Sequence, residues 1–335
     1  MKSSFWEGEH ILNLRLSHLF VVAIFWLAST ELICVRAAEF ASGPITIVVP
    51  FAAGSGTDQT ARVMAQAMTE EFGATFVIDN RGGANGILAA QYVAQAKPNG
   101  YTIFLTTNTT QVANQHLYKK LPYDPVKDFE PIGLIGRGSM FLVVSAASKI
   151  RTVQDLIKAA KEAPGKLNFG SGSSSSLVGS ELFKQLAKIE VISVPYKSNP
   201  QAVNAVLGGQ IDYMFLDSST ALPLIQGGRV HPVAVSAAKR SSAAPQVLTV
   251  AEAGLPGFEV TYWNAVYAPA GTPPNIVASL AKMISGAALS ARMVRRQESL
   301  GSEALTSTPL ELAEYQAKEV RLWGKIIRAA GIEPE

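Results

Sequence analysis

Short apolar runs rich in β-branched residues alternate with longer segments of helical period along most of this chain. Residues 45–49 (Ile-Thr-Ile-Val-Val) predict a first strand, and residues 57–72 follow as a helix with its apolar side chains on one face. Further strands are predicted at 76–78 and 101–105, with a helix at 87–96 between them. Alternation at such short intervals predicts an α/β fold with a largely parallel sheet.

The second half of the chain continues the pattern. Residues 152–162 start with the capping-box sequence Thr-Val-Gln-Asp, and residues 200–207 start with proline, which suits the first position of a helix. Residues 211–216 and 233–236 predict strands. Residues 273–331 are poor in strand formers and rich in Ala, Lys, Glu and Arg, so we expect two or three helices there.

Size and charge narrow the class of protein. The chain has 335 residues, 48% of them hydrophobic and 16% charged, which is typical of a globular protein with two domains. The net charge is only +3 and no block of Lys and Arg occurs, so we expect no nucleic-acid partner. The sequence also lacks the Gly-Lys-Ser/Thr of a P-loop and the Gly-x-Ser-x-Gly of many serine hydrolases, which argues against both classes.

The N-terminus has the pattern of a secretory signal. The apolar run 19–28 follows a segment carrying Lys2 and Arg15 and precedes Val35-Arg36-Ala37, whose small residues suit a signal peptidase. We predict a signal peptide at 1–37, cleavage near Ala37 and a periplasmic mature protein. A permanent membrane anchor is the weaker alternative, because the run is shorter than the roughly 20 apolar residues that span a bilayer.

Cysteine and histidine are scarce. The single cysteine, Cys34, lies within the predicted signal peptide, so the mature chain would have no thiol catalysis, disulfide or cysteine-bound metal. A lipid-modified Cys34 is disfavoured by the bulky, acidic residues 31–33. His116 and His231 are not in a metal-ligand spacing; we expect His231 to be structural and His116 to lie in a polar loop, exposed or beside a cleft. We therefore expect neither a metal nor a cofactor.

Three loops rich in Gly, Ser and Asn each join a predicted strand to a helix: residues 50–58, 80–86 and 168–176. Such a turn aims unshielded backbone N–H groups and the positive end of a helix dipole at one point, which makes it an anion-binding site. The alternative is that the glycines only permit tight turns. Asp58 is a candidate general base, but a carboxylate at a helix start more often caps the helix by accepting backbone N–H bonds.

Seven segments in order resemble one family, the Bug receptors of tripartite tricarboxylate transporters, over practically all of the mature chain. Each segment alone is a weak signal, but together they are specific. They lie at 50–62, 80–86, 98–102, 121–132, 194–197, 249–258 and 268–273.

The resemblance implies a type II-like periplasmic binding protein with a central ligand cleft between two α/β lobes. The first lobe would comprise residues 38–142 and the helical C-terminal part 266–335, and the second lobe residues 143–265. Two hinge crossings would fall near 141–145 and 264–268.

In this family a carboxylate is held by backbone groups and ordered water between the lobes. By position, the resemblance implies ligand contacts from both lobes and no catalytic residue. Trp263 would either stack on the ligand or pack in the core. The implied contacts are Phe51, Ala52, Gly54, Ser55, Gly56, Thr57, Asp58, Thr107, Asn108, Ser171, Gly172, Ser173, Ser174, Tyr196, Asp217 and Trp263.

The implied function is a monomeric, non-catalytic receptor that closes on a mono-, di- or tricarboxylate and delivers it to the permease subunits of a tripartite tricarboxylate-type transporter. A receptor that presents to a sensor kinase is the alternative, and a periplasmic enzyme acting on carboxylates is a weaker one. Several positions depart from the family pattern, including Ser55, Gly82, Asn85 and Leu177, and the acid at Asp217 falls one position late. Because these departures lie in or near the implied cleft, they bear on the identity of the ligand.

Overall fold

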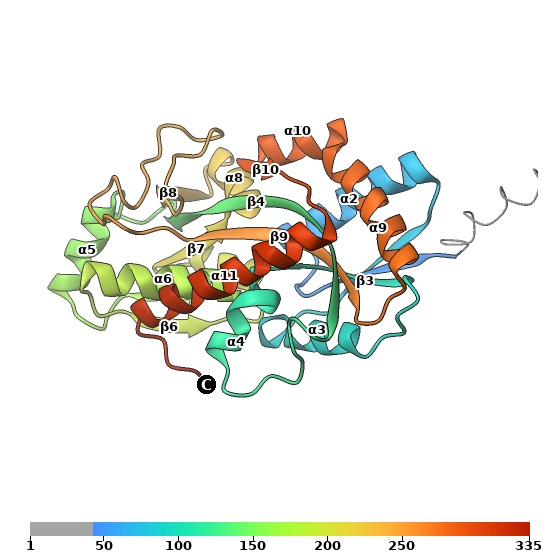
Figure 1. Ribbon diagram of the computed structural model, residues 1–335. Coiled ribbons are helices and arrows are strands. Elements are labelled where there is room, and N and C mark those ends of the chain that lie inside the picture. Colours follow the sequence, from blue (N-terminus) through green and yellow to red (C-terminus); the bar gives the residue numbers. More distant parts are fainter. Residues whose placement is uncertain (1–42) are drawn as a thin grey trace, which may run out of the picture. The chain divides into compact units, whose positions relative to one another are not determined.

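The computed structural model describes residues 43–335, so the predicted signal peptide lies outside the described residues. The strands pair in the order β2-β1-β3-β9-β4-β7-β5-β6, and β8 and β10 both pair with β4 (Figure 1). The strands are β1 (Ile45–Val49), β2 (Phe76–Asn80), β3 (Thr102–Thr107), β4 (Phe129–Ser145), β5 (Asn168–Ser171), β6 (Ile192–Pro195), β7 (Tyr213–Asp217), β8 (Val230–Val235), β9 (Thr261–Pro269) and β10 (Ser302–Ala304).

Helices connect and cover these strands. A 3₁₀ turn, η1 (Ala84–Gly86), precedes α3, and a π-helical turn, η2 (Thr109–Ala113), precedes α4. The helices are α2 (Gly56–Phe72), α3 (Ile87–Ala94), α4 (Asn114–Leu117), α5 (Val153–Glu162), α6 (Ser174–Ala187), α7 (Asn199–Leu207), α8 (Ser218–Gln226), α9 (Pro274–Leu289), α10 (Ala291–Ser299) and α11 (Pro309–Ala329).

The predicted parallel pairing is found around β1 and β5. β1 pairs in parallel with β2 and β3, and β5 pairs in parallel with β6 and β7. The sheet is nevertheless mixed, because β4 and β9 run antiparallel to each other and to their other neighbours. The sequence analysis predicted none of the strands β4, β6 and β9; Gly and Pro residues interrupt the strand pattern of β4.

The long strand β4 belongs to both lobes. Residues Phe129 to Ser139 face β9, whereas Met140 to Val144 face β7. The partner of β4 therefore changes between Ser139 and Met140, and β9 starts its pairing with first-lobe strands at Thr261. The predicted lobe limits at 142/143 and 265/266 stay predictions; the changes of pairing fall just before each of them.

The helix starts follow the capping signals in the sequence. Thr152 and Asp155 form the predicted capping box of α5. The C-terminal segment holds three helices, as predicted, together with the short strand β10, which was not predicted. Figure 1 shows α11 running along β4 and β9, and this helix packs against β4 and η2 of the first lobe and against α6 of the second.

One buried apolar cluster runs through both lobes. It joins Phe104 and Phe129 of the first lobe to Phe169 and Phe215 of the second. In residues 43–335 no single helix has the length and apolar composition to cross a membrane. Only the consecutive helices α9 and α10 taken together reach that length and composition, and they are bent by 56° where they join.

Candidate functional site

A pocket of about 470 Å³, counting the space at its mouth, lies where the two lobes meet. Its walls come from the start of α2 and the end of β3 on one side, from the starts of α6, α7 and α8 on the other, and from β4 and β9 at its base. The lining residues are Phe51, Ser55, Gly56, Thr57, Thr107, Thr109, Met140, Ser173, Ser175, Asn199, Asp217, Ser219 and Tyr262.

Four helices start at this pocket, and three of them, α2, α6 and α8, have a side-chain cap. Ser55 Oγ accepts from the Asp58 N–H at 3.2 Å for α2, and Ser173 Oγ accepts from the Ser176 N–H at 3.3 Å for α6. The Asp217 carboxylate caps α8. The first-turn N–H groups of a helix have no partner within it, and the helix dipole is positive at this end. The pocket is thus suited to a negative group without any cationic side chain.

Several pocket hydroxyls are oriented as donors by the backbone. The oxygens of Ser55 and Ser173 accept the capping bonds, and Thr107 Oγ1 accepts from the Thr109 N–H at 3.1 Å. A hydroxyl that accepts in this way still has its proton to donate. Because the backbone occupies an acceptor position in each case, the O–H groups are available to bind an anion.

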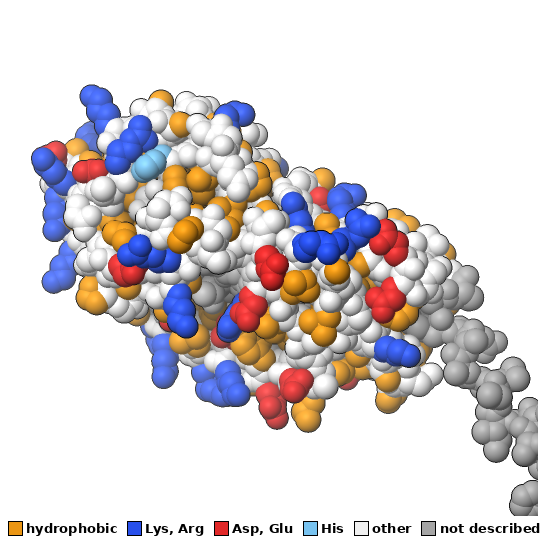
Figure 2. All heavy atoms as spheres, turned by 90° about the horizontal axis from the view of Figure 1, so that it is seen from above, with side chains coloured by type: hydrophobic (Ala, Val, Ile, Leu, Met, Phe, Trp, Pro, Cys, Tyr) orange, Lys and Arg blue, Asp and Glu red, His pale blue; other side chains and the backbone are white. Residues whose placement is uncertain are grey.

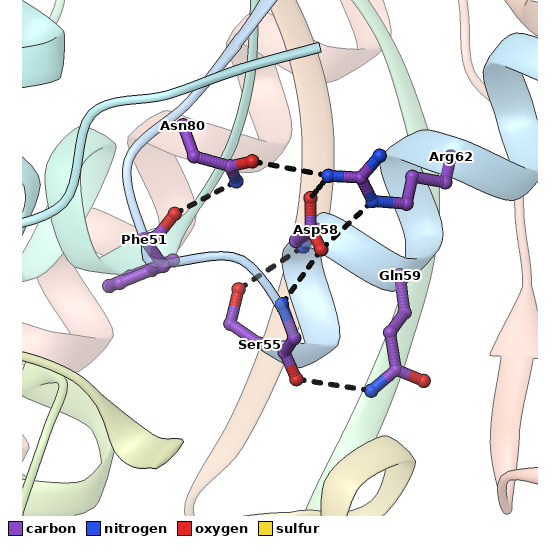
Figure 3. Close-up of polar contacts among 7 residues, drawn as sticks. Phe51, Ser55, Asp58, Gln59, Arg62 and Asn80 are labelled. Carbon is purple, nitrogen blue, oxygen red and sulfur yellow. Dashed lines mark hydrogen bonds and ion pairs between the residues drawn. The ribbon is translucent and has the colours of Figure 1, made fainter. Parts of the chain in front are cut away.

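Asp58 is engaged within its own loop (Figure 3). Its Oδ2 accepts from the Gly54 N–H at 2.8 Å, and Arg62 Nη2 lies 3.0 Å from Oδ1. Burial acts to raise the pKa of Asp58, but the hydrogen bonds from Arg62 and Gly54 outweigh it and hold the pKa below its ordinary value. Asp58 does not line the pocket, and the Gly54 N–H is used internally. The ligand contacts predicted for these two residues stay predictions.

The first two glycine-rich loops are tied to each other by one amide. Asn80 Nδ2 donates to the Phe51 carbonyl at 3.0 Å, and Asn80 Oδ1 accepts from Arg62 Nη2 at 3.4 Å (Figure 3). The loop at 80–86 therefore supports the pocket-lining loop at 50–58, and none of its residues lines the pocket.

Asp217 is held in the pocket by four hydrogen bonds. Its Oδ1 accepts from Asn199 Nδ2 at 3.0 Å. Its Oδ2 accepts from Ser219 Oγ at 2.7 Å, and from the N–H and Oγ1 of Thr220 at 3.1 and 2.7 Å. Among the residues that line this pocket in the described part of the chain, Asp217 is the only charged one. The acid of this loop is therefore a fixed feature of the pocket wall.

The lobes touch across the pocket. Ser174 Oγ in α6 donates to Asn114 Oδ1 in α4 at 2.9 Å, and Ser175 Oγ donates to Asn108 Oδ1 at 3.5 Å. Gly56 faces the second lobe so closely that a Cβ at this position would lie 2.5 Å from Asp217 Oδ2. The two lobes are therefore closed around the pocket in this structure.

The structure brings seven of the predicted contact residues to the pocket wall; the other nine do not line it. Gly172, for example, lies directly under the backbone of residues 198–199, where a side chain would not fit. The seven lining residues are Phe51, Ser55, Gly56, Thr57, Thr107, Ser173 and Asp217. The predicted residues that do not line it are Ala52, Gly54, Asp58, Asn108, Ser171, Gly172, Ser174, Tyr196 and Trp263.

Trp263 packs in the core instead of stacking on a ligand. It is fully buried, its Nε1 donates to Glu319 Oε2 at 3.1 Å, and its ring meets Tyr315 edge-on.

His116 lies in α4 and not in a loop, with Nε2 at 2.9 Å from the Val320 carbonyl, so it connects α4 to α11. His231 Nε2 contacts the Arg151 carbonyl at 3.0 Å, which agrees with its predicted structural role.

Sequence reasoning missed six lining residues. Ser175 and Ser219 each lie two positions after a helix cap, so their place in the first turn of a helix could have been inferred from the sequence. Met140 and Tyr262 come from β4 and β9, and only the pairing of distant strands brings them to the pocket base. The six residues are Thr109, Met140, Ser175, Asn199, Ser219 and Tyr262.

Residues 43–335 contain no group of three His, Cys, Asp or Glu side chains placed to bind a metal.

The arrangement of strands and helices is that of a two-lobed periplasmic binding protein. The fold is shared at 10% identity by PhnD1 from Prochlorococcus marinus, with a TM-score of 0.53 over 85% of this chain and 98% of that chain. The adipate complex of Rpa4515 from R. palustris has a TM-score of 0.86 at 33% identity and covers 89% of this chain and 100% of its own. MatC from Rhodopseudomonas palustris with bound malate has a TM-score of 0.81 at 32% identity, over 85% and 98%.

Sequence comparison assigns the family. Residues 60–332 match the tripartite tricarboxylate transporter family receptor. Protein BugT of Bordetella pertussis is 30% identical over 93% of this chain and 97% of BugT, and the UPF0065 protein in the tcbD-tcbE intergenic region of Pseudomonas sp. (strain P51) is 37% identical over 87% and 88%. The chain belongs to this receptor family, and the resemblance to the Bug receptors seen in its sequence motifs is confirmed.

Proposed function

We propose that this protein is an extracytoplasmic receptor that captures a small organic carboxylate between its lobes and delivers it to a membrane permease. The observation that carries the proposal is the convergence of three capped helix starts, those of α2, α6 and α8, on one pocket. Related receptors have been solved with adipate and with malate, which supports a carboxylate as the ligand class here.

Capture would use hinge closure. The ligand would contact α2 of the first lobe and α6 and α8 of the second at the same time, which is only possible when the lobes are together. Binding therefore shifts the population toward the closed form, and the permease would recognise that form. The bonds from Ser174 to Asn114 and from Ser175 to Asn108 add to closure and are made between protein atoms alone.

The pocket supports binding better than catalysis. Neither His116 nor His231 lines it, so no imidazole stands beside its hydroxyls. A serine nucleophile would need a base within hydrogen-bond reach, and the carboxylate of Asp217 is already bonded to four donors. We therefore propose a non-catalytic, monomeric receptor without a cofactor.

Residues 1–37 would direct this receptor to the periplasm. N-terminal sequencing of the exported protein should find a start near Ala38, and a start at residue 1 would contradict the proposed cleavage.

Figure 2 shows Lys and Arg side chains interspersed with Asp and Glu on the face it views, so no single charged patch there marks the permease contact.

The function is tested by a thermal-shift screen of the mature protein, refolded to remove carried ligand. Mono-, di- and tricarboxylates, amino acids and neutral sugars would be compared. A ligand at 100 times its dissociation constant adds about 2.7 kcal/mol to stability, a rise in the melting temperature of roughly 2–4 °C or more. Stabilisation by carboxylates is expected; stabilisation by sugars alone would refute the proposal.

Two serines of α6 provide a matched pair of variants. Ser175 lines the pocket, whereas Ser180 is equally buried in the same helix and does not line it. Ser175→Ala should weaken the binding of the best carboxylate, because it removes a pocket hydroxyl and a lobe contact. Ser180→Ala should bind as the parent does. Equal weakening by both would show that the effect is one of helix packing.

A further inference from the structure

The one charged side chain in the pocket wall lies opposite the first-lobe helix start. A Cβ built on Gly56 would meet Asp217 Oδ2 at 2.5 Å and Ser219 Oγ at a still shorter distance. The Asp217 carboxylate therefore stands within a few ångströms of the first turn of α2. A ligand whose carboxylate binds that turn has Asp217 as its neighbour from the second lobe.

Asp217 is fixed in this place and has no counter-ion. Its two oxygens are held by Asn199, Ser219 and Thr220, so it cannot turn away without giving up the cap of α8. Within residues 43–335 it takes part in no ion pair. Like charges repel strongly where water is excluded, so a second ligand carboxylate beside Asp217 is disfavoured.

Asn199 makes this wall richer in acceptors. Its Nδ2 donates to Asp217 Oδ1, while its own Oδ1 is buried and has no hydrogen-bond partner. A buried acceptor without a partner is costly, and such atoms are commonly satisfied by a bound group. Asp217 and Asn199 together therefore call for a hydrogen-bond donor from the ligand.

The two sides of the pocket thus have opposite requirements. The first-lobe side offers donors, namely the first turn of α2 and the hydroxyls of Ser55 and Thr107. The second-lobe side at Asp217 and Asn199 offers acceptors and one negative charge. A ligand that satisfies both carries a carboxylate for the donors and a hydroxyl or ammonium group within reach of Asp217 and Asn199.

We infer that this receptor selects a small carboxylate that carries a hydroxyl or ammonium group, and that Asp217 discriminates against a dicarboxylate of the same length. The inference rests on the proposed carboxylate-binding function and specifies its ligand class. Asp217 acts here as a specificity-determining residue, with Asn199 beside it.

The test compares two series of equal-length acids by isothermal titration at neutral pH. The first is butyrate, γ-hydroxybutyrate, γ-aminobutyrate and succinate; the second is hexanoate, ε-hydroxyhexanoate, ε-aminohexanoate and adipate. In at least one series the hydroxy or amino acid should bind the parent protein about tenfold or more tighter than the dicarboxylate, which corresponds to about 1.4 kcal/mol.

Asp217→Asn should remove this preference, because it keeps an oxygen to cap α8 and loses the charge. Asp217→Ser, which also suits a helix cap, serves as a second variant if the first does not fold. Asp155→Asn is the control: it removes the carboxylate of another helix start, that of α5, which does not line the pocket. It should keep the ranking of the parent.

Each outcome decides between the two proposals. Tightest binding of a dicarboxylate by the parent, or an unchanged ranking in both Asp217 variants, would overturn the inference and leave the carboxylate receptor standing. If no member of either series, and no carboxylate of the wider screen, binds the parent, both proposals fail together.

Discussion

Replacing Gly56 with alanine is expected to weaken ligand binding without weakening the fold. Gly56 is the first residue of α2 and has a helical backbone, so alanine suits its conformation. The new methyl group would nevertheless point at the second lobe, 2.5 Å from Asp217 Oδ2 and nearer to Ser219 Oγ. Because Thr220 and Ser219 hold Asp217 in place, the lobes have to stay further apart.

The size of the effect follows from this clash. Inserting a methyl group into a well-packed contact costs typically about 1–3 kcal/mol, which corresponds to about 5- to 150-fold weaker binding. The free protein would be spared this cost when its lobes open. Replacing glycine also stabilises the folded state by about 0.4–1 kcal/mol, because it lowers the conformational entropy of the unfolded chain. The melting temperature without ligand should therefore stay equal or rise.

Titration calorimetry and thermal unfolding of Gly56→Ala separate these two effects. Gly43→Ala is the matched control, because its methyl group would meet the ring of Tyr101 at 3.7 Å, an ordinary contact. It should bind ligand as the parent does. Unchanged affinity in Gly56→Ala would show that the lobes do not close as described, and a large loss of melting temperature without ligand would show that the clash lies within the folded lobe.

Two buried acids should change the pH dependence of stability in opposite directions. The pKa of Asp58 lies below its ordinary 3.8. The ionised carboxylate therefore stabilises the fold above pH 3.8, and this stabilisation is lost as the pH falls through the folded-state pKa. Asp58→Asn should lower the melting temperature at neutral pH and much less in acid. Burial raises the pKa of Glu319 above 4.5. Ionisation of this side chain therefore destabilises the fold at pH values above the folded-state pKa, and it has no such effect below pH 4.5. Glu319→Gln should be more stable than the parent at neutral pH and lose that gain in acid. Melting curves at several pH values check both, and parallel shifts at every pH would contradict the assigned pKa directions.

The helix starts show what local sequence can supply. Ser55, Thr152 and Ser173 are small polar residues directly before a helical pattern, and each caps the helix that follows it. A cap involves only residues three or four positions apart, so its signal is fully present in the chain. The binding of an anion by the loops at 50–58 and 168–176 stays a prediction.

The partners of those loops were not visible. Gly54 and Asp58 belong to the first predicted loop, but the carboxylate turns back onto the Gly54 N–H and Arg62 and leaves the pocket to Gly56 and Thr57. Which atoms of a loop face a ligand depends on its side-chain rotamers and on the support beneath it. Neither is encoded in residue type alone.

The sequence by itself determined the α/β class, the capping box of α5 and the family, because each depends on residues that are near one another in the chain or on motifs read in order. The tertiary structure decided that Met140 and Tyr262 form the pocket base, that Trp263 is buried against Glu319, and that Asp217 faces Gly56. These contacts join residues that lie far apart in the chain, and they exist only once β4 and β9 have brought the two lobes together.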